Sequence, residues 1–216
     1  MINADRSYST PLIPIKNYRS QDVLNSLGLI FNNKCYLCEI NMHSPNLFEV
    51  DHFIPVNENP LLKLEWKNLY LICSDCNKSR PKHTPSGGLM DPCDSSLSHD
   101  VEKEIVYSLP PFSYDEPSFV SKNNNPTSLL SNTIDLLLKI HYGSPNTSIK
   151  AASKREAISN QAKRLITLMH DKLFAEKYGD KVKSRQITQQ IKLMLDYKAP
   201  YTMLMRSIYL KYYDDL

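Results

Sequence analysis

Cys35-Tyr-Leu-Cys38 and Cys73-Ser-Asp-Cys76 are the two segments that decide the fold. Two thiolates three positions apart can reach one metal ion from a tight turn, and a second such pair completes a tetrahedron of ligands at about 2.3 Å. A closed site of four thiolates leaves no coordination position for a substrate, so its role is structural. The sequence therefore predicts a structural Zn²⁺ ion bound by Cys35, Cys38, Cys73 and Cys76.

The residues enclosed by the two cysteine pairs carry a second polar group. Phe48-Glu-Val-Asp51-His52-Phe-Ile-Pro55 is a strand pattern in which an acidic residue precedes a histidine. Trp66-Lys-Asn68-Leu-Tyr-Leu-Ile72 is a second apolar run, and it leads directly into the second cysteine pair and Asn77. We expect residues 34–82 to form a short hairpin, a loop and a helix.

This order of Asp-His, Asn-Leu and Cys-x-x-Cys-Asn closely resembles the HNH nucleases with a ββα-metal fold, in the subclass braced by zinc. Hydrolysis of a phosphodiester needs a base for the attacking water and a cation that neutralises charge on the phosphate. His52 is expected to be the base, because much of an imidazole is neutral near pH 7. The resemblance assigns Asp51 and Asn77 to a catalytic Mg²⁺ or Mn²⁺ ion, and it assigns Asn68 to the loop that orients His52. The last motif position is Asn rather than His, which favours such an oxygen-rich site.

Other polar residues near the motif have two interpretations. Lys78, Arg80 and Lys82 follow the last cysteine and are expected to hold phosphates, or else to be ordinary surface charges. Glu49 shares a strand face with Asp51 and could assist the metal, although the pattern favours a solvent-facing strand residue. The motif gives no role to the remaining histidines, of which His83 lies closest to the predicted helix, and Cys93 is expected to be a half-buried small residue.

The rest of the chain reads as mainly helical. Residues 1–33 begin irregular and then form a helix that starts at Ser20-Gln-Asp. Residues 127–216 repeat apolar positions at helical spacing, and the Pro- and Asn-rich residues 93–126 read as an irregular linker. We therefore expect an α+β protein with a nuclease module at residues 34–92 and a helical region at residues 127–216.

A wider resemblance extends beyond the motif. Asn33-Lys-Cys-Tyr-Leu-Cys-Glu39, the Asp-His-Phe-x-Pro segment, Trp66-Lys-Asn-Leu69 and Leu89-Met-Asp-Pro92 are similar to the PtuB-like HNH proteins of Septu and certain retron anti-phage systems. The resemblance implies a nuclease effector that works beside an ABC-type, PtuA-like ATPase. It also implies that the helical region docks this partner and extends the nucleic-acid surface.

Charge and hydropathy limit the cellular setting. The net charge is +3, from 26 Lys and Arg against 23 Asp and Glu. Residues 139–216 hold 15 basic and 7 acidic residues, so this part carries +8 and the remainder −5. The basic part could face phosphates. The sequence shows neither an apolar run of membrane-span length nor an export signal, so we expect a cytoplasmic protein without a membrane partner.

Two alternatives remain open from the sequence. The motif does not distinguish DNA from RNA, so an RNA-cleaving toxin that acts on tRNA is possible; DNA is favoured because no RNP-like aromatic strand pair or Gly-x-x-Gly loop is present. The second alternative is a non-catalytic zinc module that binds nucleic acid or protein. It differs from the nuclease in leaving His52 without a chemical role.

Overall fold

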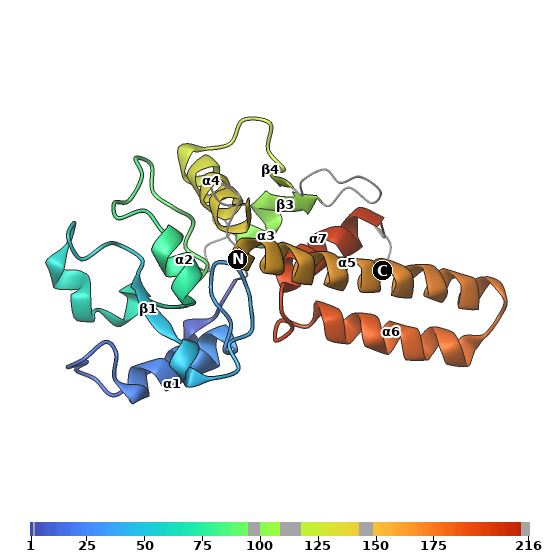
Figure 1. Ribbon diagram of the computed structural model, residues 1–216, viewed down its shortest axis with the longest axis horizontal. Coiled ribbons are helices and arrows are strands. Elements are labelled where there is room, and N and C mark those ends of the chain that lie inside the picture. The colour runs from blue at the N-terminus through green and yellow to red at the C-terminus, as the bar shows by residue number, and fades with distance from the viewer. Residues whose placement is uncertain (2, 95–99, 109–117, 143–148, 213–216) are drawn as a thin grey trace.

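The protein combines small β-hairpins with helices. The computed structural model describes residue 1 and residues 3–94, 100–108, 118–142 and 149–212 (Figure 1). In Figure 1, α1 (Gln21–Phe31), β1 (Glu49–His52) and α2 (Ser74–Ser79) lie toward one end, and α5 (Ile149–Lys177) and α6 (Lys181–Leu195) extend as a hairpin at the other. Between them, α4 (Ser128–Tyr142) contacts both α2 and α5. The predicted α+β class with a helical C-terminal region is confirmed.

The predicted N-terminal helix is α1. The Ser20 hydroxyl accepts a hydrogen bond from the Val23 N–H at 3.4 Å and so caps the helix. Its apolar face, which includes Leu27 and Phe31, is buried and packs on β2 (Leu69–Ile72). The helix ends at Asn32, whose φ of 53° lies in the left-handed region that asparagine tolerates.

The nuclease motif folds as a hairpin followed by a helix. β1 and β2 pair antiparallel, with Asp51 opposite Tyr70 and His52 opposite Leu69. All of β2 is buried, which explains its continuous apolar sequence. The loop between the strands contains the 3₁₀ turns η3 (Pro60–Leu64) and η4 (Trp66–Asn68), and α2 begins directly after Cys73. A ββα unit is therefore present at the predicted place.

The prediction of an irregular linker at residues 93–126 is wrong within its described part. Here α3 (Val101–Glu104) leads into a hairpin of β3 (Ile105–Ser108) and β4 (Ser118–Ser121). Tyr107 and Phe119 are buried, and the hairpin packs against α4 and α7 (Thr202–Tyr212). Strands of four residues are too short to show a clear alternation, and the surrounding prolines and asparagines hid them. Residues 95–99 and 109–117 lie outside the described residues.

The helical region packs directly on the first cysteine pair. Lys34 is 2% exposed, and its ammonium donates hydrogen bonds to the carbonyls of Tyr197 at 2.5 Å and Ala199 at 3.0 Å. The Glu39 carboxylate accepts a hydrogen bond from the Met203 N–H at 3.0 Å, at the start of α7. Lys34 and Glu39, which flank the cysteine pair, therefore bind the segment that joins α6 to α7 and the start of α7. Among the described residues, no helix has the length and apolar character needed to cross a membrane.

Candidate active site

The four predicted zinc ligands come together in one cluster. Their sulfur atoms all lie within 4.8 Å of one another, and those of Cys38 and Cys73 are 3.8 Å apart. A regular tetrahedron with Zn–S bonds of about 2.3 Å has edges of about 3.8 Å, which is the distance between the Cys38 and Cys73 sulfur atoms. Three of the four side chains are buried and Cys73 is partly exposed. The fold thus positions these cysteines to bind a metal ion.

A lysine from α5 contacts this cluster. The Lys154 ammonium lies 3.9 Å from the Cys76 sulfur, and the residue is 8% exposed. Burial lowers the pKa of Lys154, but the charges of the four cysteines outweigh burial and raise it, so the lysine stays charged. Four thiolates exceed the charge of one Zn²⁺ by two, and Lys154 offsets part of that excess. No sequence pattern indicates the contact between Lys154 and Cys76, because the two residues are 78 positions apart.

One open cleft collects most of the predicted catalytic residues. It has a volume of about 410 Å³ and is lined by Asp51 and His52 at the end of β1 and by Asn77 from α2. Lys82 lies on the same cleft, as do Tyr18 and Arg19 from the N-terminal arm. Although Asp51 and His52 are neighbours on an extended strand, the strand ends at His52, so both side chains border the cleft.

His52 is held in one orientation. Its Nε2 lies 3.0 Å from the Lys63 carbonyl oxygen, and the Tyr18 ring packs against the imidazole edge-on at 4.8 Å between centroids. Because a carbonyl oxygen only accepts, Nε2 carries the proton and Nδ1 keeps its lone pair. The ring therefore offers Nδ1 as a proton acceptor.

Asn68 lies behind this arrangement, 4% exposed. Its Oδ1 accepts a hydrogen bond from the Ile54 N–H at 2.7 Å, while Nδ2 donates to the carbonyls of Ile54 at 3.0 Å and Leu62 at 3.2 Å. Leu62 precedes Lys63, whose carbonyl contacts the His52 ring. Asn68 thus ties the chain after β1 to the loop that holds His52, as its assigned role requires.

The oxygen ligands predicted for Mg²⁺ or Mn²⁺ are available. The Asn77 Nδ2 donates to the Glu49 carboxylate at 2.6 Å, which leaves the Asn77 carbonyl oxygen for a cation. The Asp51 Oδ2 accepts a hydrogen bond from the Tyr36 hydroxyl at 2.6 Å, and it forms an ion pair with Arg80 at 2.5 Å. Burial raises the pKa of Asp51, and the Arg80 charge offsets only part of this effect. A carboxylate and an amide oxygen on one cleft fit a hard divalent cation.

Arg80 lines the cleft, but its guanidinium is engaged by groups of the protein. It is 9% exposed, its guanidinium pairs with Asp51, and it donates to the Phe53 carbonyl oxygen. These contacts place Arg80 inside the protein, where it orients Asp51. Lys78 and Lys82 are exposed, and of these two only Lys82 lines the cleft.

The structure adds residues that the sequence did not assign. Glu49 was weighed as a solvent-facing residue but is half-buried and holds Asn77. Tyr36 holds Asp51, and Arg19 places a further exposed cation on the cleft. Glu49 had a signal in its strand alternation with Asp51, whereas Tyr36 and Arg19 had none.

The remaining histidines and the fifth cysteine lie elsewhere. His141 is buried, and burial lowers its pKa well below the ordinary value. His83 is exposed beside Asn57, His170 packs on Phe174, and His99 lies outside the described residues. Cys93 is half-buried, as expected, and burial raises the pKa of its thiol to about 11, which keeps it unreactive.

Comparison with known proteins gives the same domain. Residues 35–82 match the family model for HNH endonuclease. The Septu protein PtuB of Bacillus mycoides (strain KBAB4) is 30% identical over 83 residues, which cover 32% of this chain and 28% of that protein. The Septu protein PtuB of Bacillus thuringiensis is 38% identical over 53 residues, covering 24% and 21%.

These matches span about a quarter of the length of either relative. No solved structure matches the chain. The cleft and the cysteine cluster both draw their residues from the matched region, apart from Tyr18, Arg19 and Lys154. Residues 35–82 are therefore an HNH endonuclease domain, and part of the chain is similar to the Septu protein PtuB.

Proposed function

We propose that the protein is a metal-dependent endonuclease that hydrolyses phosphodiester bonds, preferably of DNA, as the nuclease of an anti-phage defence system. The observation that carries this proposal is the cleft at the end of β1. There His52, whose Nε2 contacts the Lys63 carbonyl oxygen, lines the same cleft as Asp51 and Asn77. Structural Zn²⁺ on the four cysteines would fix α2, and with it Asn77, relative to the hairpin.

The residues of the cleft divide the reaction between them. His52 Nδ1 takes a proton from the attacking water, the water oxygen bonds to phosphorus, and the P–O ester bond opposite it breaks. The leaving oxygen gains its proton from solvent. Asp51 and Asn77 would hold Mg²⁺ or Mn²⁺, whose positive charge would offset the negative charge on the phosphate oxygens. Arg19 and Lys82, both exposed on the cleft, hold the neighbouring phosphates.

The direct test is cleavage of plasmid DNA and of bulk tRNA by the purified chain, in separate reactions with Mg²⁺, with Mn²⁺ and without divalent cation. We expect metal-dependent cutting of the plasmid, with tRNA cut more slowly. Faster cutting of tRNA would replace DNA by RNA as the substrate. Zinc-loaded, folded protein that cuts neither substrate, alone or with its partner ATPase, would contradict the nuclease and favour a binding module.

We also propose that an ABC-type ATPase docks on the far end of the α5–α6 hairpin. The rings of Phe174 and Tyr178 stack at 5.3 Å between centroids, and they are 49% and 69% exposed. The side chain of Val182, at the start of α6, is 68% exposed and extends this surface. Aromatic side chains exposed together supply most of the binding energy of many protein interfaces.

The docking surface predicts a loss of co-purification. The double variant Phe174→Ser with Tyr178→Ser should weaken binding to the ATPase by at least about tenfold, because truncating a central aromatic residue costs about 2 kcal/mol or more. Pull-down of the ATPase by tagged nuclease measures this effect. Leu12→Ser with Leu61→Ser removes residues that are 81% and 90% exposed elsewhere, and it should leave binding intact. Equal binding by both double variants would place the partner on another surface.

A further inference from the structure

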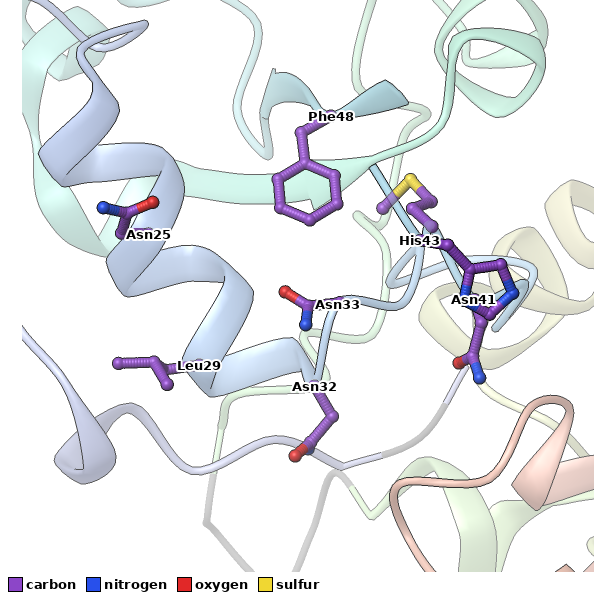
Figure 2. Close-up of a pocket in the computed structure, with 8 residues that line it drawn as sticks. Asn25, Leu29, Asn32, Asn33, Asn41, His43 and Phe48 are labelled. Atoms are coloured by element: carbon purple, nitrogen blue, oxygen red, sulfur yellow. The ribbon is translucent and has the colours of Figure 1, made fainter. Parts of the chain in front are cut away.

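A second cavity lies beside the active-site strand, outside the catalytic cleft. It has a volume of about 520 Å³, within the range of small-molecule pockets. Figure 2 shows the ring of Phe48 and the amide of Asn33 next to the side of α1 that carries Asn25 and Leu29. Asn41 and His43 complete the opposite wall.

The chemistry of this cavity is polar but uncharged. Four of its lining side chains are amides, from Asn25, Asn32, Asn33 and Asn41, and none is a carboxylate, an ammonium or a guanidinium. An amide offers both a donor and an acceptor, as the edges of nucleobases do. Apart from the His43 imidazole, the described lining residues offer only amides and apolar groups, a set that suits a neutral polar ligand.

Two features keep these amides available. Asn32 and Asn33 have φ values of 53° and 55°, so the chain turns sharply at the end of α1 and places two amides in succession on the cavity. Gly28 lies behind them, where a Cβ atom would come within 2.7 Å of the Asn33 Oδ1. The lack of a side chain at Gly28 thus leaves room for the Asn33 amide.

The cavity lies close to the proposed reaction centre. Phe48 immediately precedes β1, and His52 ends that strand. Four residues of strand at about 3.3 Å each place Phe48 about 13 Å from His52 along the chain. This separation suits neighbouring nucleotides of one strand.

We propose that this cavity binds an unpaired nucleobase of the strand being cut, with the base stacked on Phe48 and its edge bonded to the asparagine amides. The proposal rests on the proposed nuclease function and narrows the substrate to nucleic acid with unpaired bases near the scissile phosphate. Paired bases stay stacked in the duplex and cannot enter such a pocket without being unstacked.

The test uses single-stranded DNA and RNA oligonucleotides of one base throughout except for a single variable base, placed in turn at each position near the cut. The wild-type chain should prefer one base at one fixed distance from the cut. Phe48→Leu removes the aromatic face, and Asn33→Gly removes the amide while keeping the left-handed backbone. Phe48→Leu should lower kcat/KM for every base at this position, and Asn33→Gly should lower it for the preferred base, each at least about fivefold, as expected from the worth of base stacking and of contacts to base edges. Tyr8→Leu removes an exposed ring on the N-terminal arm, away from this cavity, and should leave the preference unchanged.

Binding separates this proposal from the nuclease itself. The same labelled oligonucleotides are titrated against each variant by fluorescence anisotropy without divalent cation, so no cleavage is needed. Base-selective binding that is lost in Phe48→Leu supports the pocket even if no oligonucleotide is cut, in which case only the nuclease fails. Cutting or binding that is equal for all four bases, or a preference unchanged in both pocket variants, overturns the nucleobase site.

Discussion

Replacing His52 by alanine should lower phosphodiester cleavage by about 10²–10⁴-fold, the usual contribution of a general base. Among the described residues that line the cleft, His52 alone carries an imidazole, so the variant removes the Nδ1 lone pair that would accept the proton of the attacking water. His52 is not part of the cysteine cluster, so zinc content and the circular dichroism spectrum should stay at wild-type values. The rate is measured on plasmid DNA under saturating Mg²⁺ or Mn²⁺.

His83→Ala is the matched control for this change. Its imidazole is 75% exposed and contacts Asn57, which lines the cleft, so its loss tests an imidazole beside the cleft that has no proposed role. We expect wild-type cleavage from His83→Ala. If His83→Ala lost activity and His52→Ala kept it, the base would have been assigned to the wrong histidine; if both kept it, the cleft would not be the reaction centre.

Replacing Cys73 by serine should unfold the nuclease module. Structural Zn²⁺ contributes about 10–16 kcal/mol to the folding of small zinc domains, which equals or exceeds the whole stability of a typical protein, about 5–15 kcal/mol. Cys73 is the partly exposed member of the cluster, so the substitution leaves little cavity and its effect reports mainly on the metal. We expect less than one zinc per chain and a lost or strongly lowered thermal transition.

Cys93→Ser controls for the loss of a thiol. Cys93 is partly exposed too but lies outside the cluster, so the variant should keep both its zinc and its melting temperature. Removal of zinc from the wild type by a chelator should reproduce the Cys73→Ser result. A Cys73→Ser protein that melts as the wild type does would show that packing, not metal, holds the module.

Local patterns in the sequence were enough to place much of this architecture. The cysteine spacing, the Ser20 cap and the apolar periodicity act within a few residues, and each appears in the structure where it was expected. The order of the motif residues also led us to expect Asp51, His52 and Asn77 near one another, and all three line the cleft. By contrast, the type of residue 80 indicated a surface cation, and only the fold shows its guanidinium turned inward to Asp51, 29 positions earlier.

The other surprises have the same physical origin. Lysine side chains are usually exposed, yet Lys34 and Lys154 are both buried. Each ammonium lies beside an atom of a residue distant in sequence, the Ala199 carbonyl oxygen for Lys34 and the Cys76 sulfur for Lys154. The β3–β4 hairpin was missed because its strands have only four residues each, too few for a clear alternation, although Ile, Val, Tyr and Phe favour strands and the hairpin packs on α4 and α7. The burial of these lysines and the packing of the hairpin depend on tertiary contacts, which no local sequence pattern indicates.

The contact of Lys154 with the sulfur cluster has a mechanical consequence. Phe174 lies 20 residues further along the same uninterrupted helix, a distance of about 30 Å at 1.5 Å per residue. One end of α5 therefore contacts the cysteine cluster beside the catalytic cleft, and the other end carries the exposed rings of Phe174 and Tyr178. Because the helix is stiff, a force that tilts its outer end must either bend the helix or displace the cysteine cluster, and with it α2 and Asn77.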